Sequence, residues 1–186
     1  MKIILWKGLA NQSLEYFKIE KKEGSLKVNS KILGIQEDTV FAVTYHLLID
    51  DNWFINEFTI VTEINSITTS YTGKKRNCAW EINNIPEPPE PELANIHYID
   101  ISLSPFTNSL PINNLVFKEK VPQDIDVIYI DILQGHIKPV KQRYTKLDTL
   151  SFSYENTDSD FKAILTVDHN GFVEKYPELF EKIGQV

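Results

Sequence analysis

The chain has 186 residues, of which 42% are hydrophobic and 24% charged, and its formal net charge is −7. This length accommodates one domain with a substantial core, and the negative balance argues against a nucleic-acid partner. The single cysteine excludes an internal disulfide. No apolar run is long enough for a transmembrane segment or a signal-peptide core. We therefore expect one domain over residues 1–186 in the cytoplasm.

Alternation of apolar and polar residues with a period of two recurs along the chain and predicts strands. The clearest runs are residues 39–49, 53–63, 96–103, 138–146, 150–156 and 161–168. The run 39–49 is apolar on both faces, so we expect a strand that is central in its sheet, or one that is covered on both sides.

Turn signals separate these runs. They lie at residues 23–25, 50–52, 72–74, 134–136 and 169–171. A spacing of roughly ten to fifteen residues without a long helical period predicts a mostly antiparallel all-β domain. The basic cluster at 74–76 would then lie in an exposed hairpin turn, or alternatively meet an anionic ligand.

Two segments depart from the strand pattern. Residues 86–92 contain four prolines and three glutamates, which predict an extended, exposed loop inside the domain. This loop could also serve as a docking ligand for a partner protein. Near the end of the chain, residues 177–183 predict a short C-terminal helix, because Leu179, Phe180 and Ile183 could dock together on the sheet.

Residues 104–111 read Ser-Pro-Phe-Thr-Asn-Ser-Leu-Pro, and their two prolines restrict the backbone twice. We expect an ordered bend, of the kind that often carries recognition groups on a β scaffold. Thr107 and Asn108 have two interpretations here. They contact a ligand, or they act as a structural staple by capping backbone amides.

Signatures of catalysis and cofactor binding are missing from the sequence. We find no phosphate-binding glycine loop, no nucleophile elbow, no paired-cysteine site and no H-E-x-x-H motif, so we expect no cofactor and no metal. Asp100 lies just before the proline segment. Arg143 beside Tyr144 offers a planar donor fork next to an aromatic ring, which suits carboxylate, phosphate or sugar hydroxyls. The alternative for Arg143 is an ion pair with an acidic neighbour on the sheet surface.

Several motifs carry a resemblance to a known family. The first motifs in chain order are Trp6 followed by Ser13-Leu14-Glu15, and Tyr45 followed by Asp50 or Asp51 with Trp53. Next, Asp100 lies in the run that leads into Pro105-Phe106-Thr107-Asn108-Ser109-Leu110-Pro111-Ile112. The last motifs are Gln142-Arg143-Tyr144-Thr145, and the run from Asp168 to Val173 that leads to Tyr176-Pro177. In these motifs the chain resembles, over nearly its whole length, the bacterial family labelled putative glycolipid-binding, formerly a domain of unknown function. That family commonly follows Leu-Pro-Ile with two arginines, where this chain has Asn113-Asn114. If those arginines meet an anionic head group, this chain binds such a group less strongly or prefers a neutral polar one.

The resemblance implies a twisted antiparallel β-roll or half-barrel, similar to bacterial lipoprotein carriers that hold acyl chains. It also implies non-enzymatic binding of an amphipathic small molecule, such as a glycolipid or an acyl conjugate. Apolar strand faces would hold the apolar part, and a few polar groups would orient the head. The candidate ligand-binding residues are Trp6, Glu15, Tyr45, Trp53, Asp100, Thr107, Asn108, Arg143 and Tyr144.

Two other functional classes stay open. A hydrolase-like or isomerase-like enzyme would bring Glu15, Asp100 and Arg143 together in a cleft and would need a carboxylate with a strongly raised pKa. An interaction module without a ligand cavity would use a sheet edge or residues 86–92, and would show a large exposed apolar patch. The sequence indicates no particular oligomeric state.

Overall fold

The computed structural model describes residues 1–77, 79–84 and 93–186. Its first strands are β1 (Lys2–Gly8), β2 (Ser13–Lys22), β3 (Ser25–Gln36), β4 (Thr39–Asp50), β5 (Ile55–Ile64), β6 (Ile67–Arg76), β7 (Ala79–Ile82) and β8 (Tyr98–Ile101). Then follow the 3₁₀-helix η1 (Pro105–Asn108), the helix α1 (Ser109–Asn114), and the strands β9 (Pro122–Asp131), β10 (His136–Lys146), β11 (Ser151–Asn156), β12 (Lys162–Val167), β13 (Val173–Tyr176) and β14 (Phe180–Gln185). The loop expected at 86–92 lies outside the described residues.

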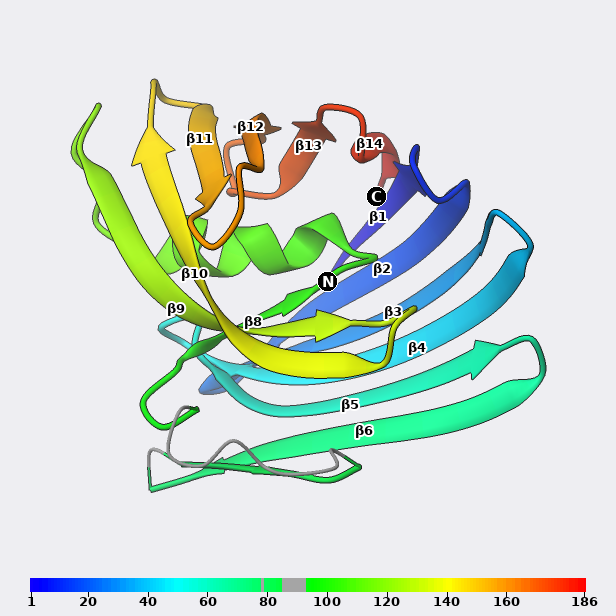
Figure 1. The fold of residues 1–186 in the computed structure, drawn as a ribbon. Coiled ribbons are helices and arrows are strands. Elements are labelled where there is room, and N and C mark those ends of the chain that lie inside the picture. Colours follow the sequence, from blue (N-terminus) through cyan, green and yellow to red (C-terminus); the bar gives the residue numbers. More distant parts are fainter. Residues whose placement is uncertain (78, 85–92) are drawn as a thin grey trace.

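All fourteen strands join one sheet, in the order β7-β6-β5-β4-β3-β2-β1-β14-β13-β12-β11-β10-β9-β8. Neighbouring strands are antiparallel except β8 and β9, which are parallel. The sheet curls around η1 and α1, and α1 is the coiled ribbon inside the concave side in Figure 1. Within the described residues no pairing joins β7 to β8, so the sheet is a half-barrel rather than a closed barrel. The expectation of a mostly antiparallel all-β fold is confirmed.

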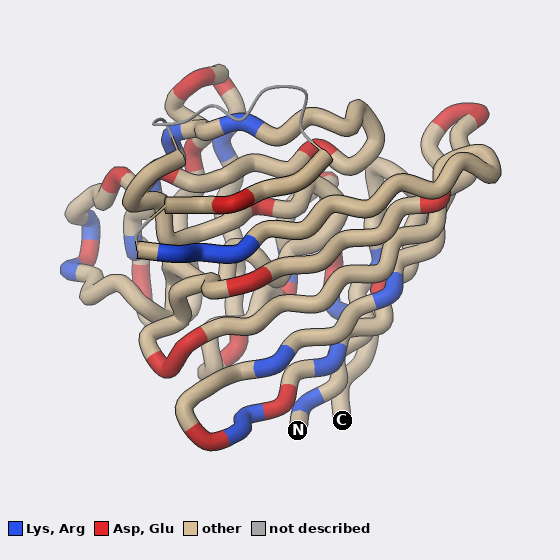
Figure 2. The backbone as a smooth tube through the Cα atoms, turned by 90° about the horizontal axis from the view of Figure 1, so that it is seen from below, with Lys and Arg blue, Asp and Glu red and all other residues tan. Residues whose placement is uncertain are grey.

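The two faces of the sheet differ because side chains alternate along each strand. In β4, Phe41, Val43 and Tyr45 point into the concave side and are buried. Val40 lies on the other face and is 59% exposed. Of the two alternatives for this strand, the central position is confirmed, because β4 lies between β3 and β5, whereas cover on both faces does not hold. Figure 2, seen from below, shows that Lys and Arg as well as Asp and Glu residues are scattered along many strands of the sheet.

Aromatic side chains fill the concave side around η1. Phe106 of η1 is fully buried, and its ring lies 4.5 Å from the ring of Phe17 and 6.2 Å from that of Phe172. Leu110 of α1 is also fully buried. The two helices thus close the space inside the curled sheet, so this space is core and not an open cavity.

The proline segment is helical, and it supplies the one α-helix of the described chain. Pro105 occupies the first turn of η1, where Ser104 Oγ accepts a hydrogen bond from the backbone N–H of Phe106 (3.3 Å). Pro111 likewise lies in the first turn of α1. Neither position needs a backbone N–H for an intrahelical bond, so both prolines are compatible with the helices. The expected bend is correctly placed, but its conformation differs from the prediction.

The predicted C-terminal helix at 177–183 was wrong. Residues 180–185 form β14, which pairs with β1 so that Phe180 lies opposite Gly8 and Lys182 opposite Trp6. Without β14, β1 would leave a row of backbone groups unpaired in the middle of the sheet, which is costly.

The turn predicted at 72–74 was also wrong, whereas the other four turn signals fall between strands. Gly73 lies inside β6, opposite Phe58 of β5. A Cβ atom at this position would lie only 2.1 Å from the Phe58 ring, so the glycine makes room for that ring. The basic residues that follow form the end of β6 and not a hairpin turn.

Candidate ligand-binding site

A buried carboxylate links the sheet to η1. Glu15 of β2 accepts three hydrogen bonds at Oε1, from Ser30 Oγ of β3 (2.7 Å), the Tyr45 hydroxyl of β4 (2.6 Å) and Ser104 Oγ (3.0 Å). The Tyr45 hydroxyl also lies 2.9 Å from Ser104 Oγ. Since Ser104 is the N-cap of η1, this cluster fixes the start of the helical segment against three neighbouring strands.

The environment of Glu15 favours its neutral form. Its side chain is 2% exposed, and Oε2 is buried without a hydrogen-bond partner among the described residues. Burial raises the pKa of Glu15 to about 7, against the three hydrogen bonds, which lower it. No cation contributes to this balance.

A second buried network centres on Asp100 of β8. Asp100 Oδ1 accepts a hydrogen bond from Thr107 Oγ1 (2.9 Å), and Oδ2 accepts one from Gln142 Nε2 of β10 (2.6 Å). The Tyr144 hydroxyl lies within donating distance of Asn108 Oδ1 (2.9 Å) and Gln142 Oε1 (3.2 Å). Burial raises the pKa of Asp100 as well, while the bonds from Thr107 and Gln142 lower it.

The helical segment holds both networks in place through its backbone. Thr107 Oγ1 accepts from the N–H of Ile101 (3.3 Å) and lies 3.3 Å from the carbonyl of Ser104, and Asn108 Nδ2 donates to the carbonyl of Pro105 (3.4 Å). The bond from the Ile101 N–H to Thr107 is the amide cap that the staple interpretation expects, whereas Asn108 bonds a backbone carbonyl instead. These contacts do not exclude a ligand contact for Asn108, because this residue also lines the hollow described next.

Beside the two networks lies a hollow of about 190 Å³, which we call the tyrosine hollow. Its aromatic walls include Tyr129 of β9, Tyr154 of β11 and Tyr176 of β13. The rings of Tyr154 and Tyr176 meet edge to face at 5.9 Å. Burial raises the pKa of Tyr129 to about 12 and raises those of the other two further, so all three phenols stay neutral.

The polar lining of the tyrosine hollow is rich in hydrogen-bond acceptors. It includes Asp100, Ser104, Asn108 and Asn156. A carboxylate has about four lone-pair sites, and each oxygen of Asp100 receives one hydrogen bond from the protein, so both can accept another. The hollow can therefore accept hydrogen bonds from hydroxyl groups and offer them aromatic walls.

The structure brings together most of the residues expected from the sequence. Asp100 and Asn108 line the tyrosine hollow, whereas Glu15, Tyr45, Thr107 and Tyr144 form the networks behind it. Trp6 is fully buried and donates its Nε1–H to the carbonyl of Val173 (2.8 Å), which anchors β1 to β13.

Two expected residues lie elsewhere. Arg143 points to the outer face and forms a two-pronged ion pair with Asp124 (2.6 and 2.9 Å), as the surface alternative expected. Trp53 lines an open groove of about 820 Å³ together with Asn113 and Phe172, at the opposite end of β1 and β14. Neither residue can contact a ligand in the tyrosine hollow.

The three hollow tyrosines were missed in the sequence. Tyr154 falls in the alternating run 150–156 and Tyr176 in a family motif, and these were the available signals. Their convergence with Tyr129 depends on the order β13-β12-β11-β10-β9 in the sheet. No local pattern in the sequence predicts that strand order.

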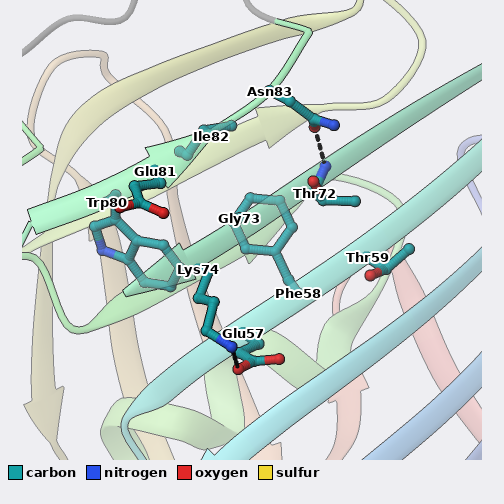
Figure 3. Close-up of a pocket in the computed structure, with 10 residues that line it drawn as sticks. All are labelled: Glu57, Phe58, Thr59, Thr72, Gly73, Lys74, Trp80, Glu81, Ile82 and Asn83. Carbon is teal, nitrogen blue, oxygen red and sulfur yellow. Dashed lines mark hydrogen bonds and ion pairs between the residues drawn. The ribbon is translucent and has the colours of Figure 1, made fainter. Parts of the chain in front are cut away.

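Another depression, of about 490 Å³, lies over β5, β6 and β7 and is shown in Figure 3. Its charges are paired within the sheet, because Lys74 forms an ion pair with Glu57, and Glu81 forms one with Arg76. Asn83 accepts a hydrogen bond from the Thr72 N–H (2.6 Å). Lys74 and Arg76 of the basic cluster thus have acidic partners in the protein itself, which gives no support to the alternative of an anionic ligand.

Comparison with known proteins places this half-barrel in a family. The model of the family described as "Putative glycolipid-binding" matches residues 3–182, so the chain belongs to that family. A solved structure, the crystal structure of a DUF1089 family protein from Pseudomonas aeruginosa, is similar with a TM-score of 0.79 and 26% identity. The match covers 91% of this chain and 92% of that one. A search of curated proteins gives no match.

The described part of the chain contains no helix that is long and apolar enough to cross a membrane.

Proposed function

We propose that the protein binds an amphipathic small molecule of the glycolipid class, and that the tyrosine hollow receives its hydroxyl-rich head group. The observation that carries this proposal is the acceptor-rich, tyrosine-walled hollow without a paired cation. The family description supports the same class of ligand.

The chemistry of the hollow favours a neutral head group. Asp100 lines it and Glu15 lies directly behind Ser104, and neither carboxylate has an ion-pair partner among the described residues. A phosphate or sulfate would meet carboxylates and no compensating charge, which is unfavourable in a buried site. Sugar hydroxyls, in contrast, donate hydrogen bonds to carboxylate and amide oxygens, and the faces of Tyr154 and Tyr176 offer apolar contact.

The size of the hollow limits what it can hold. A volume of about 190 Å³ corresponds to about six water molecules at ~30 Å³ each. It also lies below the range of about 300–1,000 Å³ that is typical of pockets for drug-sized ligands. One sugar ring fits this volume, whereas a ring with its acyl chain does not. Because Phe106 and Leu110 fill the space inside the sheet, the apolar part of a ligand has to leave toward solvent.

Titration calorimetry with octyl β-glucoside below its micelle concentration tests the proposal, with octyl sulfate as the anionic comparison. We expect binding of the glucoside and much weaker binding of the sulfate. Tyr154→Phe removes a hydroxyl that has no hydrogen-bond partner among the described residues, so folding should be unaffected. It should weaken glucoside binding about fivefold, the value of one hydrogen bond of about 1 kcal/mol.

Tyr16→Phe is the matched control, because Tyr16 is 48% exposed on the outer face of β2. Its affinity for the glucoside should equal that of the unmodified protein. Native mass spectrometry of freshly purified protein adds an independent readout, in which a retained glycoside-sized adduct is expected. Absence of an adduct together with no uptake of any alkyl glycoside would refute the proposal.

The enzyme hypothesis has less support in the geometry. Glu15 has the raised pKa that it requires, but Glu15 does not line the hollow and is separated from it by Ser104. Arg143, its third member, lies on the outer face with Asp124.

A further inference from the structure

We propose that the open groove lined by Trp53 is a second binding site, which takes a neutral oligosaccharide and uses Trp53 as its stacking platform. The groove lies at the opposite end of β1 and β14 from the tyrosine hollow. A ligand bound there is therefore separate from the head group that the tyrosine hollow receives.

Two turns with the same backbone geometry, which we call the twin turns, contribute the aromatic side chains of this groove. The pattern Asp-x-Asn-x-Phe occurs at residues 50–54, between β4 and β5, and again at 168–172, between β12 and β13. In each turn the aspartate Oδ1 accepts from the N–H of the third and the fifth residue, at 2.8 and 3.0 Å for Asp50 and at 2.9 and 3.0 Å for Asp168. The aspartate carbonyl accepts from the N–H of the fourth residue, at 3.0 and 2.9 Å. The chain thus builds one turn structure twice.

The fourth residue of each twin turn has a left-handed backbone. It is Gly171 in the second turn, with a φ of 73°, and Trp53 in the first, with a φ of 64°. Glycine adopts this region without strain, whereas in other residues the Cβ atom crowds the following carbonyl. Tryptophan is therefore unfavourable at a position where the same turn elsewhere in the chain has glycine. Backbone strain of this kind concentrates at functional sites, which indicates a role for the Trp53 side chain.

The Trp53 side chain is positioned by the protein but still reaches the groove. It is half-buried, and its ring centroid lies 6.1 Å from that of Phe172 in the other twin turn, edge to face. Asn114 of α1 donates to the carbonyl of Asn52 (2.7 Å), which ties the first twin turn to the helix. The indole N–H has no hydrogen-bond partner among the described residues. Trp53 therefore offers a held ring and one unused donor.

The other side chains of the groove combine apolar surface with unused hydrogen-bonding capacity. Ile19 and Leu26 supply aliphatic surface. The side chains of His169 and Asn170 have no partner in the described part of the chain. Asn113 donates through Nδ2 to a backbone carbonyl of α1 (2.8 Å), and its Oδ1 has no such partner. A pyranose ring matches this lining, because its C–H face packs on aromatic and aliphatic surface while its hydroxyl groups donate and accept hydrogen bonds.

The charges of the groove favour a neutral ligand. No Asp or Glu side chain is among the described residues that line it, and both of its lysines already have acidic partners. Lys2 Nζ lies 2.7 Å from Asp168 Oδ2 and 4.3 Å from the centroid of the Phe172 ring. Lys21 Nζ lies 3.7 Å from Asp51 Oδ1 and is mostly exposed. An anionic ligand would have to compete with these carboxylates, whereas a neutral sugar would not.

The size of the groove indicates a ligand of more than one sugar ring. Its volume of about 820 Å³ is more than four times the 190 Å³ of the tyrosine hollow. It lies within the range of about 300–1,000 Å³ that is typical of ligand pockets. Because the groove is open, further sugar units can continue into solvent. An oligosaccharide therefore suits it better than a monosaccharide.

Quenching of tryptophan fluorescence by iodide reports on this groove directly. Trp6 is fully buried and Trp80 is 3% exposed, so among the three tryptophans iodide reaches the half-buried Trp53 most readily. The probes are maltotriose, cellotriose, mannotriose and triacetylchitotriose, which are neutral trisaccharides that differ in linkage or substituents. We expect at least one of them to reduce the quenching. Octyl glucoside, which the tyrosine hollow binds, should leave it unchanged.

Trp53→Gly gives the first twin turn the residue that the second already has. The thermal unfolding midpoint should stay within about 4 °C of the wild-type value, because relief of the left-handed backbone offsets the lost packing. Calorimetry should show trisaccharide binding weakened roughly tenfold, since the aromatic platform is gone.

Two further variants complete the design. His169→Ala removes an exposed side chain that has no partner in the described chain, so folding should be unaffected and binding should weaken about fivefold. Glu37→Gly is the matched control for the backbone change at Trp53. Glu37 is exposed in the turn between β3 and β4 and has a φ of 52°, and its replacement should leave trisaccharide binding unchanged.

The outcomes separate the groove from the tyrosine hollow. If none of the four trisaccharides protects Trp53 from iodide, the groove is not an oligosaccharide site. Wild-type affinity in Trp53→Gly would refute the platform, and a much larger fall in its unfolding midpoint would assign Trp53 to packing of the core instead. Octyl glucoside binding to the same variant should be unchanged, and it decides the proposed function independently of these results.

Discussion

Replacing Glu15 with glutamine should change how the stability of the protein depends on pH. Glu15 is completely buried, and its carboxyl group connects β2, β3, β4 and the N-cap of η1 through one oxygen. Glutamine has nearly the same shape and can accept the same hydrogen bonds, but it does not titrate. Comparing the wild-type protein with Glu15→Gln therefore isolates the effect that protonation of this one group has on stability.

The direction and the size of the change in stability with pH follow from the raised pKa of Glu15. In the unfolded chain the pKa has its ordinary value of 4.5, and in the folded protein it is about 7. Below pH 4.5 both states hold the proton, and the contribution of Glu15 to stability is fully present. Between 4.5 and 7 only the folded state holds it, so stability falls as the pH rises. At about 1.4 kcal/mol for each tenfold change in proton affinity, the loss totals about 3 kcal/mol and is complete above pH 7.

Urea unfolding between pH 4.5 and 8 measures this effect. We expect the free energy of unfolding of the wild-type protein, minus that of Glu15→Gln, to fall by about 3 kcal/mol across this range. Glu63→Gln, on the exposed outer face of β5, should follow the wild-type curve and serves as the control. A wild-type minus Glu15→Gln difference that stays level, or that rises with pH, would refute the account of Glu15 as a buried acid that folds in its neutral form.

Three further substitutions test other parts of the structure. Phe106→Ala should lower the free energy of unfolding in urea by roughly 3–5 kcal/mol, because it empties the centre of the core; a loss below 1 kcal/mol would contradict that packing. Gly73→Ala should lower it by about 1–3 kcal/mol, since the new methyl group meets the ring of Phe58; a stabilised variant would show that the ring is not held there. Arg143→Ala should leave both the unfolding midpoint and octyl glucoside binding unchanged, because its ion pair with Asp124 is exposed and remote from the tyrosine hollow; weaker glucoside binding would move the site to the outer face.

The fold was predictable where the sequence pattern is local. The alternation in residues 138–146 places Val140, Gln142 and Tyr144 on one face, and all three are buried in β10. The same pattern already placed Arg143 on the opposite face from Tyr144. A donor fork next to that tyrosine in sequence could therefore not share its site.

The predictions that were wrong or incomplete depend on contacts between residues far apart in the sequence. Residues 177–183 are too few to distinguish a helical period from a strand, and β14 forms because β1 needs a partner from the far end of the chain. In the candidate site, too, residues that are close in sequence were predicted, and residues that the sheet brings together were not. Asp100, Thr107 and Asn108 were expected because they are close in sequence, whereas Tyr129 and Tyr176 meet through the strand order of the sheet.

The pairing of β1 with β14 also has a consequence for protein synthesis. The strands β1 to β7 lie on one side of this pair and β8 to β13 on the other, so its hydrogen bonds are the ladder that unites the two parts of the sheet. A ribosome makes β1 to β7 first, and hairpins between neighbours can form while the rest is still being translated. Until β14 appears, β1 presents an open edge to other nascent chains. Among the fourteen strands of this sheet β14 is made after all the others, and it is the strand that ends this exposure.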